Sequence, residues 1–98
     1  MTPAILHAIE TVLGITPVGV LGRSRVSSVA HARKCGYYLA RHVYGWGWHQ
    51  VGRAFGRGHQ PAIVGCRRIE WEMRHNGHLV CRINEMAAIL RESKEQAA

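Results

Sequence analysis

Hydrophobic positions recur at intervals of three and four residues along most of the chain, which is the spacing of one face of an α-helix. The stretches with this spacing are separated by glycines, prolines and short polar runs, which are typical of helix ends and turns. No stretch alternates apolar and polar residues with the period of a β-strand over more than a few positions. The pattern therefore predicts an all-α fold, a compact bundle of about six helices.

Recognisable signals mark where these helices begin and end. Thr2 and Thr16 each precede a proline, and a capping threonine followed by proline at the first helical position is a common helix start. Glycine or asparagine follows the last apolar position of most stretches and indicates a helix end. The predicted helices run from Thr2 to Gly14, from Thr16 to Gly22, from a cap at Ser27 or Ser28 to Gly45, from Gly47 to Phe55, from His59 to Asn76, and from about Leu79 into a polar tail.

The length and composition fit one small globular domain. The 98 residues are 47% hydrophobic, and we expect the domain to occupy residues 1–92, with the polar tail at residues 93–98. No uncharged apolar run approaches the roughly 20 residues that span a bilayer, and the start of the chain lacks the order of a secretory signal. Three widely spaced cysteines fit a reducing compartment. We therefore expect a soluble cytoplasmic protein without a membrane partner.

Charge is distributed unevenly along the chain. The formal net charge is +7, and no acidic residue lies between Thr11 and Ile69. An excess of cations without anions across the middle of a folded domain is self-repelling unless a polyanion binds it, and nucleic acid is the obvious polyanion. The cations of this window are Arg23, Arg25, Arg33, Lys34, Arg41, Arg53, Arg57, Arg67 and Arg68.

The glycine-containing break at residues 56–58 separates a short helix from a long basic one. This is the pattern of a helix-turn-helix, which lays its second helix in the major groove of DNA. The N-terminal turn of that helix, with Arg57, is suited to phosphate contact, and His59 and Gln60 are placed to reach base edges. The pattern predicts that this turn points outward.

The residues around the break resemble a known family. The order Leu39-Ala40-Arg41, then Val51-Gly52-x-Ala54-Phe55-Gly56-Arg57-x-His59, is similar to the C-terminal DNA-binding domain of the bacterial replication initiator DnaA, a Trp-repressor-like helix-turn-helix. The similarity in helix order and loop length extends from Ile5 to about Leu90. It implies that an arginine of the basic loop, for which Arg25 is the best match, enters the minor groove. It also implies that the start of the helix at His59 reads the major groove.

Two departures from the family pattern concern base reading. Gly58 stands where the family has aspartate, and Gln60-Pro61 replaces two threonines. The helix can still form, since proline in a first turn loses no intrahelical bond. Glutamine can bond adenine in bidentate fashion, whereas the threonine contacts are lost. We therefore expect the shape of the domain to be kept and the target sequence to differ from that of the initiator, whose ATPase domain this chain also lacks.

The function predicted from these features is sequence-specific binding of double-stranded DNA by a nucleoid-associated regulator. We favour transcription regulation, as in domains resembling this one that activate phage-like gene clusters. The alternative is a helix-turn-helix-shaped protein-interaction module or replication modulator that acts on the initiator, on RNA polymerase or on another regulatory protein, with Gln60, Val64 and Trp71 as its surface. RNA binding is a weaker third reading, and the oligomeric state stays open. The predicted DNA-binding residues are Arg23, Arg25, Arg33, Lys34, Arg41, Arg53, Arg57, His59, Gln60, Arg67 and Arg68.

Metal binding and catalysis are less well supported by the sequence. His31 and Cys35 lie one helical turn apart, but structural zinc sites usually show two tight ligand pairs with thiolates. Cys35, Cys66 and Cys81 fall on apolar stripes, where small buried hydrophobes are the expectation. A Cys–His dyad would require Cys66 to leave its stripe. We therefore expect no metal, no cofactor and no enzymatic activity.

Overall fold

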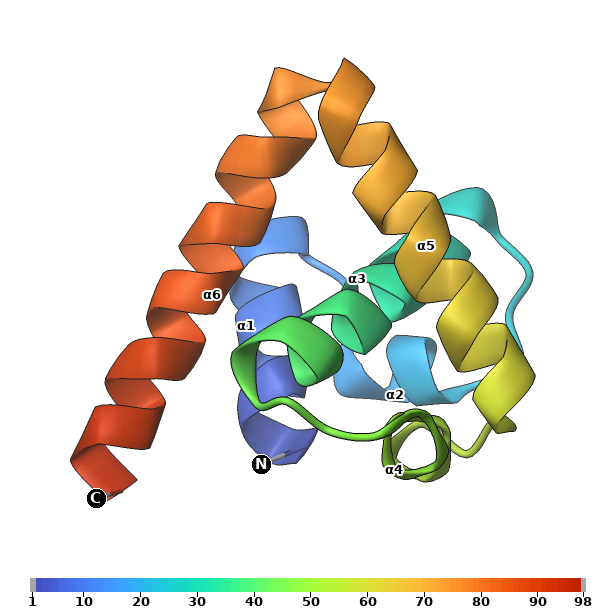
Figure 1. Cartoon of the computed structure of the whole chain (residues 1–98), viewed down its shortest axis with the longest axis horizontal. Coiled ribbons are helices and arrows are strands. Elements are labelled where there is room, and N and C mark those ends of the chain that lie inside the picture. The colour runs from blue at the N-terminus through green and yellow to red at the C-terminus, as the bar shows by residue number, and fades with distance from the viewer. Residues whose placement is uncertain (1, 98) are drawn as a thin grey trace.

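The computed structural model describes the backbone of residues 2–97 and the side chains of residues 2–93, and between residues 2 and 97 it contains helices and no strand. The predicted all-α fold is confirmed, with six helices in the described chain (Figure 1). They are α1 (Thr2–Leu13), α2 (Pro17–Leu21), α3 (Ser27–Val43), α4 (Trp48–Ala54), α5 (His59–His75) and α6 (Gly77–Ala97).

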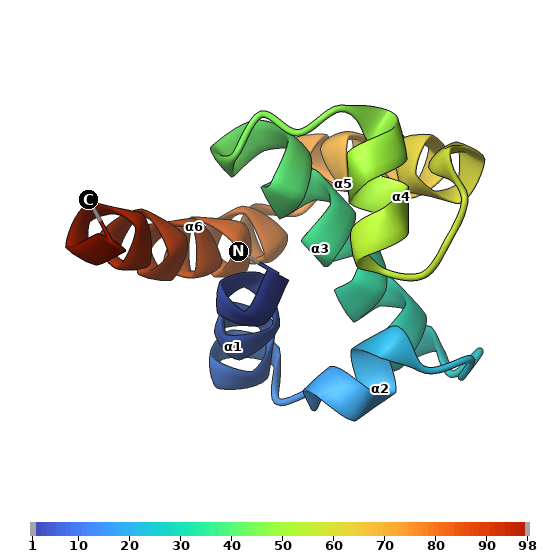
Figure 2. The ribbon, with the colours of Figure 1, turned by 90° about the horizontal axis from the view of Figure 1, so that it is seen from below.

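The helix α3 lies in the middle of the bundle and packs against every other helix. In Figure 1, α5 and α6 meet at their shared end and diverge on either side of α3, while α1 lies beside α6 and α4 beside α5. Figure 2 shows the last turns of α6 extending to one side of the bundle. Side chains from all six helices, and from the turn after α4, form the core of the described chain. Its largest fully buried members include Ile5, Ile9, Val20, Leu39, Phe55, Ile69, Met86 and Leu90.

Most of the predicted helix ends are observed within a residue or two. The Thr16 hydroxyl accepts a hydrogen bond from the Gly19 N–H at 3.2 Å, so the predicted cap of α2 is confirmed. The prediction that Ser27 or Ser28 caps α3 is wrong, because the helix already begins at Ser27 and the cap position is Val26, without a side-chain hydrogen bond.

The last helix is longer than its apolar pattern indicated. The Asn76 carboxamide oxygen accepts hydrogen bonds from the N–H groups of His78 at 3.1 Å and Leu79 at 3.3 Å. The helix α6 begins at Gly77, directly after Asn76. Its backbone stays helical to Ala97, through most of the predicted tail. Lysine, glutamate, glutamine and alanine are all good helix formers, so polarity alone did not end the helix.

The close approach of α5 to α3 depends on a small residue. A Cβ atom at Gly65 would lie 2.7 Å from the Tyr37 ring and 3.1 Å from Cγ of Lys34. The Tyr37 ring in turn meets the edge of Phe55, with ring centroids 5.2 Å apart and planes at 90°. The Tyr37 ring of α3 thus packs between α5 and Phe55, the residue that follows α4. This contact helps to set the position of α4 relative to α5.

Candidate nucleic-acid interface

The turn between α4 and α5 is tight and depends on two glycines. Gly56 has φ of 66°, in the left-handed region that glycine adopts without strain. The Arg57 N–H donates to the Gly52 carbonyl at 2.8 Å, which folds the chain back over the end of α4. A Cβ at Gly52 would lie 2.7 Å from both the Arg57 and the Gly58 carbonyl oxygens. Both glycines are therefore needed for the helix-turn-helix geometry.

The start of α5 is open to solvent, as the sequence predicted. Gln60 and Pro61 are exposed, and so is Val64 one turn later. His59 is half-buried, and its ring lies against that of His49 on α4, with centroids 4.3 Å apart. The exposed face of α5 therefore begins with Gln60, while part of the His59 ring packs against α4.

The basic loop between α2 and α3 is held in place by two arginines. Arg33, on α3, donates from Nε to the Val20 carbonyl at 2.8 Å and from Nη2 to the Gly22 carbonyl at 2.9 Å. Arg57, from the turn before α5, donates from Nη2 to the same Gly22 carbonyl at 2.6 Å. The end of α2 is thereby tied both to α3 and to the helix-turn-helix.

Two of the predicted DNA-binding arginines are placed where they support the fold. Arg33 is only 8% exposed, and burial, followed by the charge of Arg57, lowers the pKa of its guanidinium. Arg41 donates to the Trp46 carbonyl at 2.9 Å, and its guanidinium lies 4.6 Å from the centre of the Trp48 ring. Helical spacing put both residues off the apolar stripe, but long side chains can turn inward to reach backbone carbonyls. Arg33 therefore lies behind the surface and organises the loop.

Cations of the basic loop, of the turn before α5 and of the neighbouring parts of α3 and α5 line three adjoining grooves. A groove of about 470 Å³ lies between the basic loop and the turn before α5, and one of about 490 Å³ lies between the loop, α3 and α5. A third of about 260 Å³ reaches Pro61 and Val64. Each pair of grooves shares lining residues, so they form one continuous surface, which we call the basic face. Its cationic side chains are Arg23, Arg25, Lys34, Arg57 and Arg68, with Arg33 at its floor.

Besides Arg41, two predicted cations lie outside these grooves. Arg53 on α4 and Arg67 on α5 are both exposed, and neither lines any of the three. Among the described side chains, no acidic group lies within ion-pair distance of either. They belong to the two helices of the helix-turn-helix, α4 and α5.

The acidic residues of α5 turn towards α3. Glu72 pairs with His31 at 3.1 Å and with Arg68 at 3.4 Å, and Glu70 pairs with His42 at 3.3 Å. Glu72 also lines the groove that contains Arg68, so it reduces the positive charge at that edge of the basic face. The pairs with His31 and His42 join residues 41 and 28 positions apart, so the charge pattern of the sequence did not show them.

Hydroxyl groups of the basic face were not among the DNA-binding residues predicted from the sequence. Ser24, Ser27 and Ser28 line its grooves beside the arginines. Serine hydroxyls often contact phosphate in protein–DNA complexes. The signal was present in the alternation of serine and arginine at residues 23–28, but these serines were interpreted only as loop and cap residues.

The cysteines divide into two kinds. Cys35 and Cys66 are fully buried, and burial raises the pKa of each thiol to about 12. A thiol with such a pKa is protonated at neutral pH, which argues against a cysteine nucleophile. Cys81 is exposed on α6, so the prediction that all three are buried is wrong for this residue.

A family model described as the bacterial dnaA protein helix-turn-helix matches residues 3–69, which include α1 to α4 and the first part of α5. The chain belongs to this family. One relative is the chromosomal replication initiator protein DnaA of Pseudothermotoga lettingae, which is 29% identical over 76 residues. That alignment covers 78% of this chain and 17% of the relative, so the chain spans less than a fifth of the initiator's length.

Membership of the DnaA helix-turn-helix family confirms the resemblance predicted from the sequence and shows a domain of DNA-binding type. The family match ends at Ile69, whereas the predicted similarity extended to about Leu90, so the end of α5 and the whole of α6 lie beyond the match. In the described part of the chain, no helix combines the length and the hydropathy needed to cross a bilayer.

Proposed function

We propose that this protein binds double-stranded DNA in a sequence-specific manner, with α5 in the major groove and the basic loop in the neighbouring minor groove. The observation that carries this proposal is the continuity of the basic face, which joins Arg25 of the loop to the exposed start of α5. A recognition helix and a minor-groove arm must contact the same duplex at once, and both lie along this one surface.

The residues have distinct proposed roles. Arg25, which is exposed and has no acidic partner among the described side chains, enters the minor groove. Gln60 reads base edges, with adenine as its best partner. His59, restrained by His49, assists at the edge of that contact. Phosphates are bound by Arg23, Lys34, Arg53, Arg57, Arg67 and Arg68.

Regulation of transcription is the role that we propose for this binding. Gln60-Pro61 in place of the family's two threonines changes the donors, acceptors and methyl groups offered to the bases. A domain with altered base contacts would select sites other than those of the initiator, and this supports a regulatory role over competition at a replication origin.

Selection of duplexes from a random pool tests both the binding and its specificity. The unmodified protein should enrich one motif, and Gln60→Ala should relax the motif at one or two positions. The double variant Arg25→Ala/Arg67→Ala should bind the selected duplex at least about tenfold more weakly. Arg91→Ala, an exposed arginine on α6, is the matched control and should bind like the unmodified protein. Absence of any duplex binding at low salt would reject the proposal.

The alternative function, a protein-interaction module, is favoured by one observation. Val64 is 64% exposed and Trp71 is 48% exposed, on the outward side of α5. Among the described side chains, the Trp71 ring contacts Arg68 and His75 of its own helix, and its exposed part is available to a partner such as RNA polymerase or another regulatory protein. Val64→Ser/Trp71→Ala should abolish such an interaction, while Arg25→Ala/Arg67→Ala should leave it intact.

A further inference from the structure

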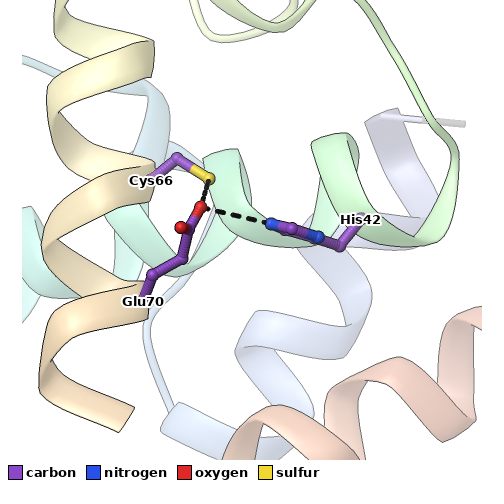
Figure 3. A group of neighbouring side chains, drawn as sticks. All are labelled: His42, Cys66 and Glu70. Atoms are coloured by element: carbon purple, nitrogen blue, oxygen red, sulfur yellow. Dashed lines mark hydrogen bonds and ion pairs between the residues drawn. The ribbon is translucent and has the colours of Figure 1, made fainter. Parts of the chain in front are cut away.

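We propose that His42, Cys66 and Glu70 form a binding site for a divalent, thiophilic metal ion of the zinc class. His42 lies in the last turn of α3, and Cys66 and Glu70 lie one turn apart in the middle of α5 (Figure 3). The three side chains point towards one another across the gap between the two helices. His42 lies at the end of α3 opposite to the basic loop.

The distances between the donor atoms suit a tetrahedral ion. The Glu70 carboxylate oxygen lies 3.4 Å from the Cys66 sulfur and 3.3 Å from His42 Nε2. Zinc bonds of about 2.0–2.3 Å at tetrahedral angles place donor atoms roughly 3.3–3.8 Å apart. All three donors lie within 4.8 Å of one another. His42 is exposed, so its ring can move. A shift of about 1 Å brings His42 Nε2 and the Cys66 sulfur to the separation expected for two ligands of one zinc ion.

Burial of the three ligands leaves one side of the site open. The Cys66 side chain is fully buried, whereas those of His42 and Glu70 are 46% and 38% exposed. An ion held there would be anchored by the thiolate from within and would keep a position for water on its outer side. Three protein ligands and one water is a common coordination of zinc.

The surroundings orient the ligands. The Tyr38 ring, one turn before His42, lies 4.3 Å from the imidazole centroid and limits its range of rotation. Without an ion, the Cys66 thiol donates to the Glu70 carboxylate, and this thiol has its pKa raised to about 12 by burial and by Glu70. Coordination therefore replaces the S–H bond with a metal–sulfur bond, and the released proton leaves through Glu70 to solvent.

A second group of the same residue types serves as an internal comparison. His31 lies 4.0 Å from the Cys35 sulfur through Nδ1 and 3.1 Å from Glu72 through Nε2. Opposite edges of one ring face the two partners, so no single ion can be bound by all three. Both groups contain a histidine, a cysteine and a glutamate that lie close together. Only in the group of His42, Cys66 and Glu70 do the three donor atoms, among the described residues, face a common point.

Titration of metal-free protein with Co²⁺ tests the proposal. The unmodified protein should develop a thiolate-to-cobalt charge-transfer band that saturates at one equivalent. Cys66→Ser should lose the band, and Cys81→Ser, which alters an exposed cysteine on α6, should keep it. No charge-transfer band in the unmodified protein, or an equal band in Cys66→Ser, would overturn the proposal.

Variants of the two exposed ligands guard against a folding defect in Cys66→Ser. His42→Gln and Glu70→Gln should each weaken Co²⁺ binding by at least about tenfold, with an unchanged helical circular dichroism spectrum. His7→Gln, which alters an exposed residue of α1, should bind like the unmodified protein. Zn²⁺ should raise the melting temperature of the unmodified protein and of His7→Gln, and the rise should be smaller in His42→Gln and Glu70→Gln. Equal binding by all four proteins would contradict the assigned ligands.

Discussion

In the first half of α5, Gln60, Pro61 and Val64 face solvent, whereas in the second half Glu70 and Glu72 turn back to pair with histidines of α3. One continuous helix thus offers free side chains at one end and is tied to the bundle at the other. The difference shows why a count of cations describes this molecule poorly. What matters for a polyanion is which cations have no partner within the fold.

The same contrast divides the arginines. Arg23 and Arg25 are exposed, while Arg33 and Arg57 bind the Gly22 carbonyl beneath them. Arg33 and Arg57 hold the basic loop in the conformation that exposes Arg23 and Arg25. Substitutions that affect the fold and substitutions that affect only DNA contact should therefore have different effects, and they are ordered here by the size of the expected effect.

Substitution of Gly52 should have the largest effect. In Gly52→Val the new side chain would meet the backbone of Arg57 and Gly58 at under 3 Å, and backbone atoms cannot move aside cheaply. We expect the free energy of unfolding to fall by about 3 kcal/mol, measured by urea denaturation. Gly77→Ala, where a Cβ meets nothing within 4 Å, should leave it nearly unchanged. Equal stability of the two variants would contradict the role given to the turn.

Loss of the buried guanidinium should come next. In Arg33→Lys a single ammonium cannot bind the Val20 and Gly22 carbonyls as the planar guanidinium does. We expect a loss of about 2 kcal/mol in unfolding free energy, together with weaker duplex binding because the basic loop loses its support. Arg53→Lys, on an exposed residue of α4, is the same chemical change without a described hydrogen bond and should alter stability little.

Neutralising Glu72 should have the smallest effect on stability, and it should change duplex affinity in the opposite direction to Arg33→Lys. Glu72→Gln removes the pairs with His31 and Arg68, which are part-exposed and worth about 0.5 kcal/mol. Removing an anion from the basic face should nevertheless strengthen duplex binding by about threefold at low salt. Glu85→Gln, which alters an exposed residue of α6, should change neither quantity. Weaker duplex binding by Glu72→Gln would show that Arg68 needs its partner in order to contact DNA.

Much of the fold was predictable because helix ends are set locally. Proline after threonine, glycine after an apolar stretch and the three-to-four spacing each act within a few residues, and the Thr16 cap and the break before α5 were found in this way. The helix-turn-helix was predictable from the glycine-containing break at residues 56–58, because the positive φ of Gly56 is a local requirement of the backbone.

The details of the site were less predictable because they depend on contacts between distant residues. Arg33 appeared on a polar face of its helix, and only the position of the Gly22 carbonyl, set by tertiary packing, shows why its side chain turns inward. His42 and Glu70 are 28 residues apart, so no spacing rule connects them. His31 and Cys35 attracted attention as a local pair, although their donor atoms do not converge with Glu72.

The salt dependence of duplex binding tests the central claim most directly. If the basic face, together with Arg53 and Arg67, engages about six phosphates, the logarithm of the affinity should fall with the logarithm of salt concentration at a slope near −5. Arg23→Ala should reduce that slope by about one, and Arg91→Ala should leave it unchanged. A shallow slope in the unmodified protein, or an equal change in both variants, would contradict the claim that this face binds DNA.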